Sequence, residues 1–477
     1  MLTRIMKHEW RMLVSDRTLA GLVSVFALIV IYGLHNGTSW TRFLQEIQQA
    51  VQEEEIQRLG KLKEAVVSFE QGKADKVVPD PRSAASVGAS AGTRSAFLPT
   101  TALAVLTVGQ SDLYPSYFKV TTRSKDTIIN HDEIENPTNL LTGRFDLAFV
   151  MIALYPLLIL AISYNLLSGE RENGTLALLL SQPVALRTYL LGKISLRLIV
   201  VLLLAVAFTS VGALLVGISP TNTESLWRFT LWTGMVMAYG LFWFSVVMVV
   251  NAFGMRSGAN ALVSIGVWLA FVVVIPSFVT IAVTTLYPVP SRVELVQAIR
   301  AASTEANAKG SRLLAKFYED HPELVPEGAI NLNDFATRSY AAQEEVERQI
   351  QPVLARYDEQ LIRQQAWVDQ WRFVSPAIVA QEALNVLSGT SVARYRHFLN
   401  QVDAFHREWQ SFFIPKIFQR VRLTSADIEA MPRFTFVEES SGAVIGKAIT
   451  SLFGLILPAC LIGWIAIVRL RRYPLSE

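Results

Sequence analysis

The sequence predicts an all-α polytopic membrane protein with six transmembrane helices and a mainly helical extracytoplasmic domain. Apolar residues make up 51% of the 477-residue chain, and six stretches of it are long and almost wholly apolar. A bilayer core about 30 Å thick requires ~20 apolar residues per spanning helix. Because lipid offers the backbone no water to bond, such stretches form helices. Charged residues are still 17% of the chain, so a sizeable part of it lies in water.

The predicted spans are separated by short loops and by two long polar segments. In chain order we expect a cytoplasmic interfacial helix (1–17), spans at 18–34, 145–167, 194–218, 227–253, 261–287 and 443–468, extracytoplasmic segments at 35–144 and 288–442, a cytoplasmic loop at 168–193 and a cytoplasmic tail at 469–477.

Basic residues accumulate on one side of these spans. They are Arg4, Lys7, Arg11, Arg17, Arg171, Arg187, Lys193, Arg197, Arg256, Arg469, Arg471 and Arg472. The positive-inside rule places that side, with both termini, in the cytoplasm. The net charge of +3 is too small to indicate a nucleic-acid partner. The single cysteine, Cys460, allows no intramolecular disulfide, which fits a periplasmic domain on a bacterial cytoplasmic (inner) membrane protein.

The first 17 residues have an amphipathic helical pattern. The basic residues lie off the apolar stripe, and Trp10 suits the headgroup level; the stripe consists of Leu2, Ile5, Met6 and Leu13. This favours a helix that lies on the cytoplasmic leaflet, with membrane lipid as a partner. The alternative is a basic flank that only sets the topology.

The two outer segments show mostly helical periodicity. In the first, a helical start gives way at residues 72–95 to an Ala-, Ser-, Gly- and Pro-rich stretch that predicts a mobile loop. Residues 113–120 predict a short strand or a turn. In the second, helices are expected over 293–318, 340–373 and 391–413, and a strand over 433–437. The aromatics of the fourth span, such as Trp232, Tyr239 and Trp243, suit a dimer interface or lipid packing.

The cytoplasmic loop carries the most specific motif. From Ser168 it reads SGERENGTLALLLSQPVALR. Acidic residues open a short helix, Leu176, Leu179 and Leu180 share one face of it, and Pro183 ends it. A helix this short cannot form a domain, so its apolar face needs either a protein partner or the lipid surface. The pattern alone does not decide between them.

This loop resembles the signature of ABC-2 type transporter permeases. The matching runs are residues 170–176 (ERENGTL), 180–183 (LSQP) and 192–193 (GK). The outer segments resemble a subgroup of these permeases that has large extracytoplasmic insertions of unknown function. The runs that carry this second resemblance are residues 143–149 (GRFDLAF), 375–376 (SP) and 394–399 (RYRHFL).

The resemblance implies that the loop 168–187 is a coupling helix that docks into a separate ATPase subunit. Four residues would then position this helix: Glu170, Glu172, Gly174 and Thr175. Leu176, Leu179 and Leu180 would contact the ATPase groove. Pro183 would end the helix. The family also implies that two permeases, identical or related, pair with two ATPase subunits. ATP and Mg²⁺ would bind the partner, and this chain would bind no cofactor.

Motifs for chemistry on the chain itself are absent from the sequence. Residues 442–448 (GAVIGKA) are one residue short of a P-loop and lack its hydroxyl, so the chain is not predicted to be an ATPase. His397 and His406 lie nine apart with no carboxylate in register, and His131 with Glu135 reads as a polar turn, so no metal site is predicted. No catalytic residue is proposed.

Three prolines fall inside predicted spans: Pro156, Pro276 and Pro458. Each is a candidate hinge, and the alternative is that neighbouring helices tolerate it. Acidic residues are missing from the depth of the predicted spans, since Asp146 lies at an end. This counts against an ion-driven carrier or channel, which needs such groups in the membrane.

We therefore expect the transmembrane permease of an ATP-driven exporter, with an amphipathic or lipid-linked substrate. The second reading is a mechanotransmission complex, in which ATP hydrolysis acts on an extracytoplasmic partner and nothing crosses the membrane. The large outer segments favour that reading. The carrier is the third, and it predicts transport without an ATPase.

Overall fold

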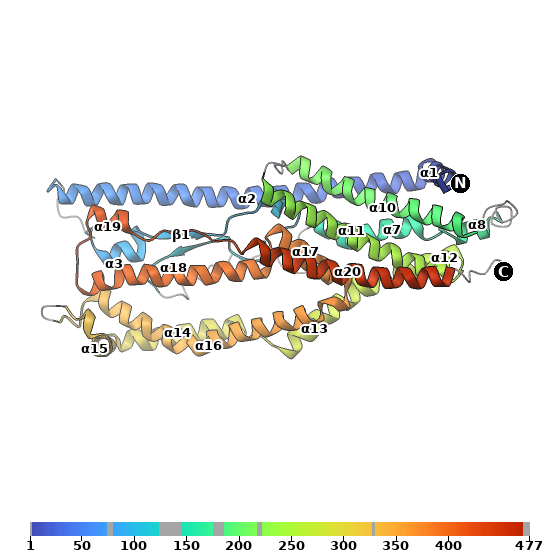
Figure 1. The fold of residues 1–477 in the computed structure, drawn as a ribbon. Coiled ribbons are helices and arrows are strands. Elements are labelled where there is room, and N and C mark those ends of the chain that lie inside the picture. The colour runs from blue at the N-terminus through green and yellow to red at the C-terminus, as the bar shows by residue number, and fades with distance from the viewer. Residues whose placement is uncertain are drawn as a thin grey trace.

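The chain folds into an elongated molecule that has two parts. The computed structural model describes residues 2–73, 80–123, 145–174, 186–216, 222–326 and 330–470. Long helices bundle at one end, and further helices with one small sheet form the other (Figure 1). In the described part, six segments are long and apolar enough to span a membrane: Arg17–Glu70, Leu147–Glu172, Thr188–Leu214, Thr223–Ala252, Ser257–Leu286 and Ser441–Leu470. The predicted fold class is confirmed.

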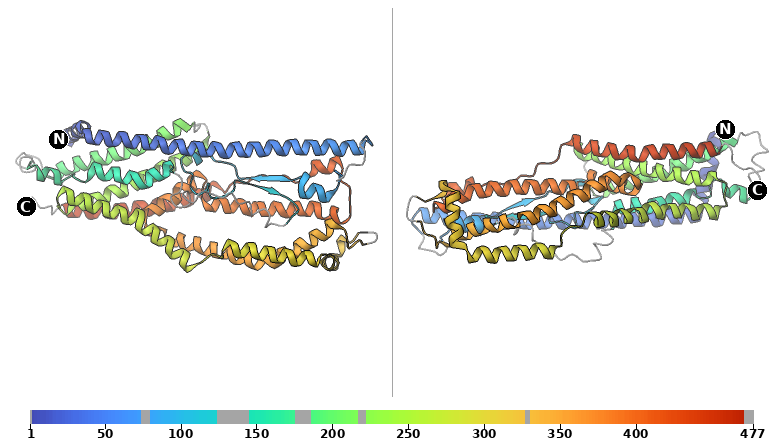
Figure 2. Two further views of the ribbon diagram at one scale, coloured as in Figure 1. Left: turned by 180° about the vertical axis from the view of Figure 1, so that it is seen from behind. Right: turned by 90° about the horizontal axis from the view of Figure 1, so that it is seen from below.

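We call the six-span part the membrane bundle and the rest the distal domain. Helix α1 (Leu2–Ser15) lies across the end of the bundle farthest from the distal domain, which we call the proximal end (Figure 2). The end of helix α20 (Ser441–Leu470) lies at the same end (Figure 1). Both ends of the described chain therefore lie on one side of the bundle.

Helix α2 (Arg17–Glu70) joins the two parts as one continuous rod. The Asp16 carboxylate separates it from α1 by accepting the backbone N–H groups of Thr18 (2.9 Å) and Leu19 (3.2 Å), as a helix N-cap does. Its 54 residues correspond to about 80 Å, and it runs from the proximal end to the far end of the distal domain (Figure 1). The predicted first span and the outer helix that follows it are one element.

Glycine lets α2 pass close to other backbone at the outer end of the bundle. A Cβ atom at Gly37 would lie 2.0 Å from the carbonyl oxygen of Val105, in the short 3₁₀-helix η2 (Ala102–Val105). One turn earlier, a Cβ at Gly33 would lie 3.0 Å from the carbonyl oxygen of Asp146. Such close approach is typical of small residues in membrane helices.

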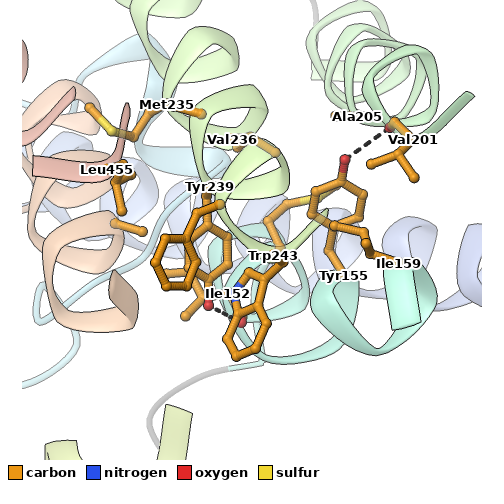
Figure 3. Packing of buried hydrophobic residues seen from close by; sticks show 14 of the residues in the cluster. Ile152, Tyr155, Ile159, Val201, Ala205, Met235, Val236, Tyr239, Trp243 and Leu455 are labelled. Carbon is orange, nitrogen blue, oxygen red and sulfur yellow. Dashed lines mark hydrogen bonds between the residues drawn. The ribbon is translucent and has the colours of Figure 1, made fainter. Parts of the chain in front are cut away.

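Helix α11 (Thr223–Ala252) is the centre of the membrane bundle. It packs against α7 (Tyr155–Ser163), α10 (Leu186–Val216), α12 (Ser257–Leu269) and α20. Trp232, Tyr239 and Trp243 of α11 are fully buried within the chain. Figure 3 shows Tyr239 and Trp243 among the neighbouring helices. The expectation that these aromatics face lipid or a dimer partner is therefore wrong: they fill the space between helices of one bundle.

Helix α17 (Pro376–Ser388) leaves the distal domain and packs among the spans. It contacts α11, α20 and the π-helical turn η4 (Ala270–Val274) between α12 and α13 (Ile275–Leu286). Its N-cap residue, Ser375, donates from Oγ to the carbonyl oxygen of Phe271 at 2.6 Å. The Phe373 ring packs directly against Gly454 of α20: a Cβ atom at Gly454 would lie only 2.5 Å from the ring. Because Phe271 and Gly454 lie midway along their spans, the start of α17 reaches the interior of the bundle.

The first core of the distal domain packs α18 (Val392–Phe418) against α2 and a two-stranded sheet. Strand β1 (Arg94–Phe97) pairs antiparallel with β2 (Tyr117–Val120), with Arg94 opposite Val120. The predicted mobile loop at 72–95 is only partly a loop. Short helical turns, α3 (Ala84–Ser86) and η1 (Val87–Ala91), place small residues and Val87 against the aromatic face of α18.

The second core of the distal domain is made by three helices. Helix α16 (Phe335–Trp371) packs along α14 (Arg292–Ala308) and α15 (Gly310–Asp320). The 3₁₀-turn η5 (Pro322–Leu324) follows α15, and the 3₁₀-turn η6 (Arg372–Val374) leads from α16 into α17. Phe418, at the end of α18, stacks on Phe317 of α15 at 4.7 Å and joins the two cores.

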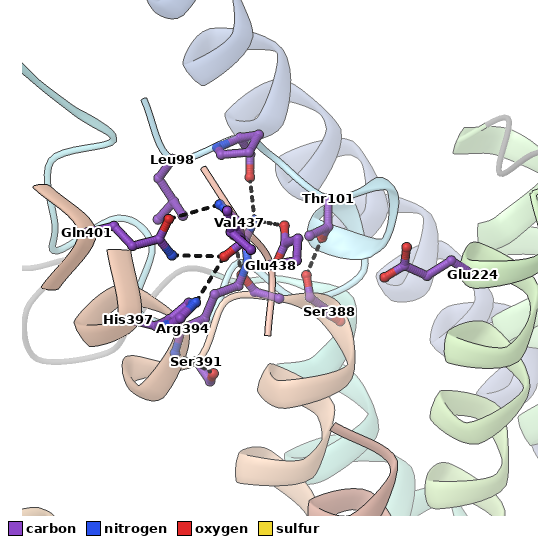
Figure 4. A network of polar contacts seen from close by, with 12 residues as sticks. Leu98, Thr101, Glu224, Ser388, Ser391, Arg394, His397, Gln401, Val437 and Glu438 are labelled. Carbon is purple, nitrogen blue, oxygen red and sulfur yellow. Dashed lines mark hydrogen bonds and ion pairs between the residues drawn. The ribbon is translucent and has the colours of Figure 1, made fainter. Parts of the chain in front are cut away.

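An extended linker connects the distal domain, through α19 (Ser425–Ala430), to α20. The predicted strand at 433–437 is absent from this described segment. Instead, the backbone of Val437 is bonded on both sides by the Gln401 amide, at 2.8 and 2.9 Å (Figure 4). The next residue, Glu438, accepts a hydrogen bond at its carboxylate from Arg394 Nε at 2.9 Å. Arg394 also donates to the carbonyl oxygens of Gly389 and Pro99. Side chains of α18 replace the strand partner that this linker lacks.

Candidate functional site

The predicted coupling loop begins at the proximal end of the bundle. The second span consists of α6 (Leu147–Phe149), a π-helical turn η3 (Val150–Leu154), α7 and, after a turn, α8 (Ser168–Glu172). Glu170 and Glu172 lie in α8, and Gly174 ends it in the left-handed conformation at φ 67°. Glycine takes this conformation without strain. The other predicted coupling residues lie outside the described residues: Thr175, Leu176, Leu179, Leu180 and Pro183.

Four charges from three helices meet at the start of this loop, three of them buried and the fourth, Glu170, partly exposed. Arg197 of α10 binds Glu9 of α1, with Nε and Oε1 2.7 Å apart. Lys193, one turn earlier, binds Glu170 with Nζ and Oε1 2.6 Å apart, and lies 3.8 Å from the Glu9 carboxylate. Glu9, Lys193 and Arg197 are 3%, 2% and 6% exposed. The charges alternate in sign, so each buried group has an opposite partner, as burial of charge requires.

Arg197 also holds the end of α7. Its Nη1 donates to the carbonyl oxygen of Ile162 at 2.6 Å and to the side-chain oxygen of Asn165 at 3.1 Å. The last carbonyls of a helix have no partner within the helix and carry negative partial charge. A cation there is therefore stabilising, and this contact joins the second span to the third.

A second set of contacts joins the loop to the fifth span. The Glu172 carboxylate accepts the backbone N–H of Ser257, the first residue of α12, at 2.6 Å. The hydroxyls of Ser168 and Ser257 are 2.8 Å apart. Asn260 donates to both Ser168 Oγ and Asn251 Oδ1 at 3.3 Å. Glu172 thus provides the N-terminal anion that α12 lacks in its own first turn.

Together these contacts fix the start of the loop to α1, α10, α11 and α12. A displacement of α8 cannot occur without moving or breaking them, because Glu170 is paired with the buried Lys193 and Glu172 is bonded to the first residue of α12. What the geometry of the described residues can do is transmit movement between a loop at the bundle surface and four helices.

Sequence reasoning missed Glu9 as part of the site. The signal was available: Glu9 is four residues from both Ile5 and Leu13, so it lies on the apolar stripe of α1 and not on its basic face. A carboxylate on the buried face of an interfacial helix requires a buried cation opposite. The sequence reasoning used Arg197 only as a topology signal, and Lys193 as a topology signal and as part of the GK run, but it assigned neither residue an ion-pair partner.

Two of the three prolines lie just after a π-helical turn. Pro156 follows η3, and Pro276 follows η4. A proline lacks the N–H for the preceding turn and its ring displaces that turn, which explains the widened π-helical geometry. Pro458 lies inside α20.

Neighbouring helices bond the carbonyls at both π-helical turns. Tyr239 of α11 donates its hydroxyl to the carbonyl oxygen of Ile152, four residues before Pro156, at 2.8 Å (Figure 3). Ser375 does the same for Phe271, five residues before Pro276. The hinge interpretation is supported by the widened turns, which can bend. The alternative, that neighbouring helices tolerate the prolines, is supported by the side chain that bonds each turn.

We predict that Tyr239→Phe lowers stability by about 1–2 kcal/mol, because the Ile152 carbonyl then lacks a bond inside the bundle. The measurement is the thermal midpoint of the purified protein by fluorescence-detected gel filtration. Tyr32→Phe is the matched control, since Tyr32 is 57% exposed on α2. Equal midpoints for the two variants would contradict a holding role for Tyr239.

The described residues contain no group of three or more His, Cys, Asp or Glu side chains that could hold a metal ion. His397 contacts the Val437 carbonyl oxygen at 2.9 Å, and His406 contacts that of Arg123 at 2.8 Å. Both have structural partners. His131 and Glu135 lie outside the described residues.

Comparison with known families decides the nature of the bundle. Residues 95–284 match the family model for the ABC-2 family transporter protein. This region is an ABC-2 transporter membrane domain. The match runs from the sheet of the distal domain through four spans, and it includes the whole of the predicted coupling loop. Residues 292–437 match a domain of unknown function (DUF3526). No curated protein matches the chain.

The chain is accordingly a multi-pass membrane component of an ABC transporter. An ABC-2 domain is not itself an ATPase, and the family implies an ABC ATPase partner and a dimeric assembly. Helix α2 and helix α20 lie outside both matches. The unknown-function domain covers α14 to α18 and most of the extended linker, and therefore includes α17 inside the bundle.

Proposed function

We propose that this chain is the permease subunit of an ATP-driven exporter and couples to a separate ATPase subunit through the loop 168–187. The observation that carries the proposal is the buried charge network at the start of that loop. It ties Glu170 to α10 and α1, while Glu172 is tied to α12. A surface loop with no mechanical role does not need a network with three buried charges to fix its first turn.

The orientation follows from the charge of the proximal end. Arg4, Lys7 and Arg11 are exposed on α1, and a basic, amphipathic helix across a bundle end suits the cytoplasmic leaflet. The proximal end and both termini then face the cytoplasm of a bacterium. The distal domain then lies outside the cytoplasmic membrane.

ATP drives the cycle through the partner subunits. The partner binds ATP and Mg²⁺, and its closure moves the coupling helix, whose Leu176, Leu179 and Leu180 form the contact face. The charge network passes that movement to α1 and α10, and the Ser257 contact passes it to α12. The turns before Pro156 and Pro276 absorb the bend. Two permeases, identical or related, complete the pathway.

Affinity purification from native membranes tests this proposal. We expect an ABC ATPase to be retained by the wild-type chain and by a Leu191→Glu control, and to be lost from the Leu179→Glu, Leu180→Glu variant. Leu191 is 55% exposed on α10, outside the loop 168–187. Mass spectrometry identifies the retained proteins, and a second permease in the same eluate would make the dimer heteromeric.

Retention of the same ATPase by the loop variant would rule out the loop as the contact. If neither mass spectrometry nor chemical cross-linking finds an ATPase, the exporter proposal fails, and an ion-driven carrier becomes the better account.

Mechanotransmission remains the second candidate function, because α2 is continuous. A 54-residue helix that starts at the proximal end and ends in the distal domain conveys tilting of the first span directly to the outside. A chain in which a flexible linker replaces residues 292–363 keeps α17 in the bundle and tests this reading. Export that persists without α14 and most of α16 favours transport; retained ATPase coupling with loss of the extracytoplasmic output favours mechanotransmission.

A further inference from the structure

The end of α16 enters the membrane bundle beside α13. Gln364 of α16 donates from Nε2 to the carbonyl oxygen of Tyr287, just past the end of α13, at 2.6 Å. Farther along the chain, Ser375 bonds Phe271 in the middle of the same span. The residues between these two bonds cover about 16 Å as a helix, half of a bilayer core about 30 Å thick. Residues 364–375 therefore lie at the depth of the outer half of the fifth span, where α16 meets α13 (Figure 1).

A contact with a different span places the end of α16 at the same depth. The Phe373 ring packs against Gly454, which lies near the middle of α20. From there α17 returns to the outer end of the bundle, where Thr101 donates its hydroxyl to the carbonyl oxygen of Ser388. The end of α16, η6 and α17 thus form a re-entrant hairpin whose turn lies near the middle of the bilayer. Irregular backbone occurs at that depth only where protein covers it or where it lines a water-filled space.

The descending arm of this hairpin carries polar side chains at membrane depth. Asp369 and Gln370 of α16 are exposed, and Gln365 donates from Nε2 to Asp369 Oδ1 at 3.1 Å. Acidic residues are missing from the depth of the predicted spans, so the hairpin is the element that brings a carboxylate there. A carboxylate that faces lipid is strongly disfavoured, and such groups face water or a polar partner. The exposed face of α16 is therefore not a lipid-facing surface.

The charges of the hairpin do not cancel. Residues 364–388 contain the carboxylates of Asp369 and Glu382 and the single cation Arg372, which leaves a net charge of −1. Among the residues that the structure describes, neither carboxylate has an ion-pair partner. The nearby Lys447 of α20 is neutralised by Glu439, with Nζ and Oε2 3.0 Å apart. This surface therefore attracts a positively charged group and repels an anion.

We propose that this face of α16 lines the water-filled path of the transporter and binds an amphipathic cation there, with Asp369 opposite the positive group. Trp371 and Phe373, 46% and 47% exposed, provide apolar contact for the rest of the molecule. The contact of this face with water does not depend on the proposed function. Its role as a substrate site rests on that function, and it then identifies the class of cargo.

Thiol labelling tests whether the face lies in water. The single cysteine, Cys460, is exposed on α20 and is first replaced by serine. Gln370→Cys is then compared with Phe278→Cys. Phe278 is 67% exposed on α13, about midway between Phe271 and Tyr287, and so lies at a similar depth. In native membranes made permeable to the reagent, we expect a charged methanethiosulfonate to label Gln370→Cys and not Phe278→Cys. Equal labelling of the two variants, or no labelling of Gln370→Cys, would overturn the proposal.

Reagents of opposite charge test the role of Asp369. At Gln370→Cys, we compare the rates of a trimethylammonium and a sulfonate methanethiosulfonate. Asp369→Asn should lower the ratio of these rates about fivefold, because one nearby charge acts with opposite sign on the two reagents. Glu359→Gln is the matched control: Glu359 is exposed on the same helix but ten residues away, paired with Arg363, and its loss should leave the ratio unchanged. A ratio that Asp369→Asn does not alter would contradict the role of Asp369.

An apolar cation and an apolar anion of the same shape test the class of ligand. Tetraphenylphosphonium should slow the labelling of Gln370→Cys by neutral hydroxyethyl methanethiosulfonate, and tetraphenylborate should not. Equal protection by both ions, or none by the cation, would show that the face does not select amphipathic cations. None of these measurements needs the ATPase. Failure here leaves the proposed function standing, and loss of the ATPase partner leaves the water-facing site standing.

Discussion

Gly37→Ala is expected to destabilise the protein strongly. The added methyl group would lie 2.0 Å from the Val105 carbonyl oxygen, which is backbone and cannot rotate away. Helix α2 or η2 must shift, which opens the packing at the junction of the bundle with the distal domain. Overpacking of this kind costs about 1–3 kcal/mol or more. The measurement is the thermal midpoint in detergent, with the yield of monodisperse protein.

Gly60→Ala is the matched control on the same helix. A Cβ there meets nothing within 4 Å, so the change should stabilise α2 by about 0.5–1 kcal/mol through helix propensity. Opposite signs for the two substitutions are the expected result. Two stabilising substitutions would mean that α2 does not pass against η2 as described.

Arg197→Met is expected to have the second large effect. It leaves the Glu9 carboxylate with only Lys193, at 3.8 Å, and frees the carbonyl of Ile162. Removal of one partner of a buried pair costs about 3–5 kcal/mol. We expect a lower thermal midpoint and, where the complex survives, ATPase activity that no longer responds to the permease.

A surface ion pair provides the comparison for Arg197. Arg363 and Glu359 are 2.6 Å apart and both more than half exposed, so Arg363→Met should change stability by less than about 1 kcal/mol. Glu9→Gln combined with Arg197→Met should recover part of the loss, because no unpaired charge is then buried. Additive losses in the double variant would show that the two residues do not act as a pair.

The spans and the family of the membrane domain could be predicted because each rests on a local pattern. Apolar runs of spanning length locate the six helices, and the ERENGTL run lies inside the region that matches the family model, while its coupling role stays a prediction. Helix α17 escaped prediction because its 13 residues are too few to span a membrane. A short apolar segment between longer spans is consistent with a re-entrant or buried helix, and that signal was available.

Features that depend on distant segments could not be predicted. The bonds of Tyr239 and Ser375 to carbonyls before prolines require knowledge of which helices are neighbours. The extended linker at 433–437 alternates like a strand, yet its partner is the Gln401 side chain. The aromatics of α11 look alike whether they face lipid or protein, because both surroundings are apolar.

The most direct test of the central claim is a photo-cross-linking amino acid at position 179, in the complex within native membranes. The account predicts an adduct with an ABC ATPase that changes in yield when ATP is trapped, and no such adduct from the same amino acid at position 461, which is exposed on α20. Adducts with lipid alone at position 179, in membranes where an ABC ATPase for this permease is present, would contradict coupling through this loop.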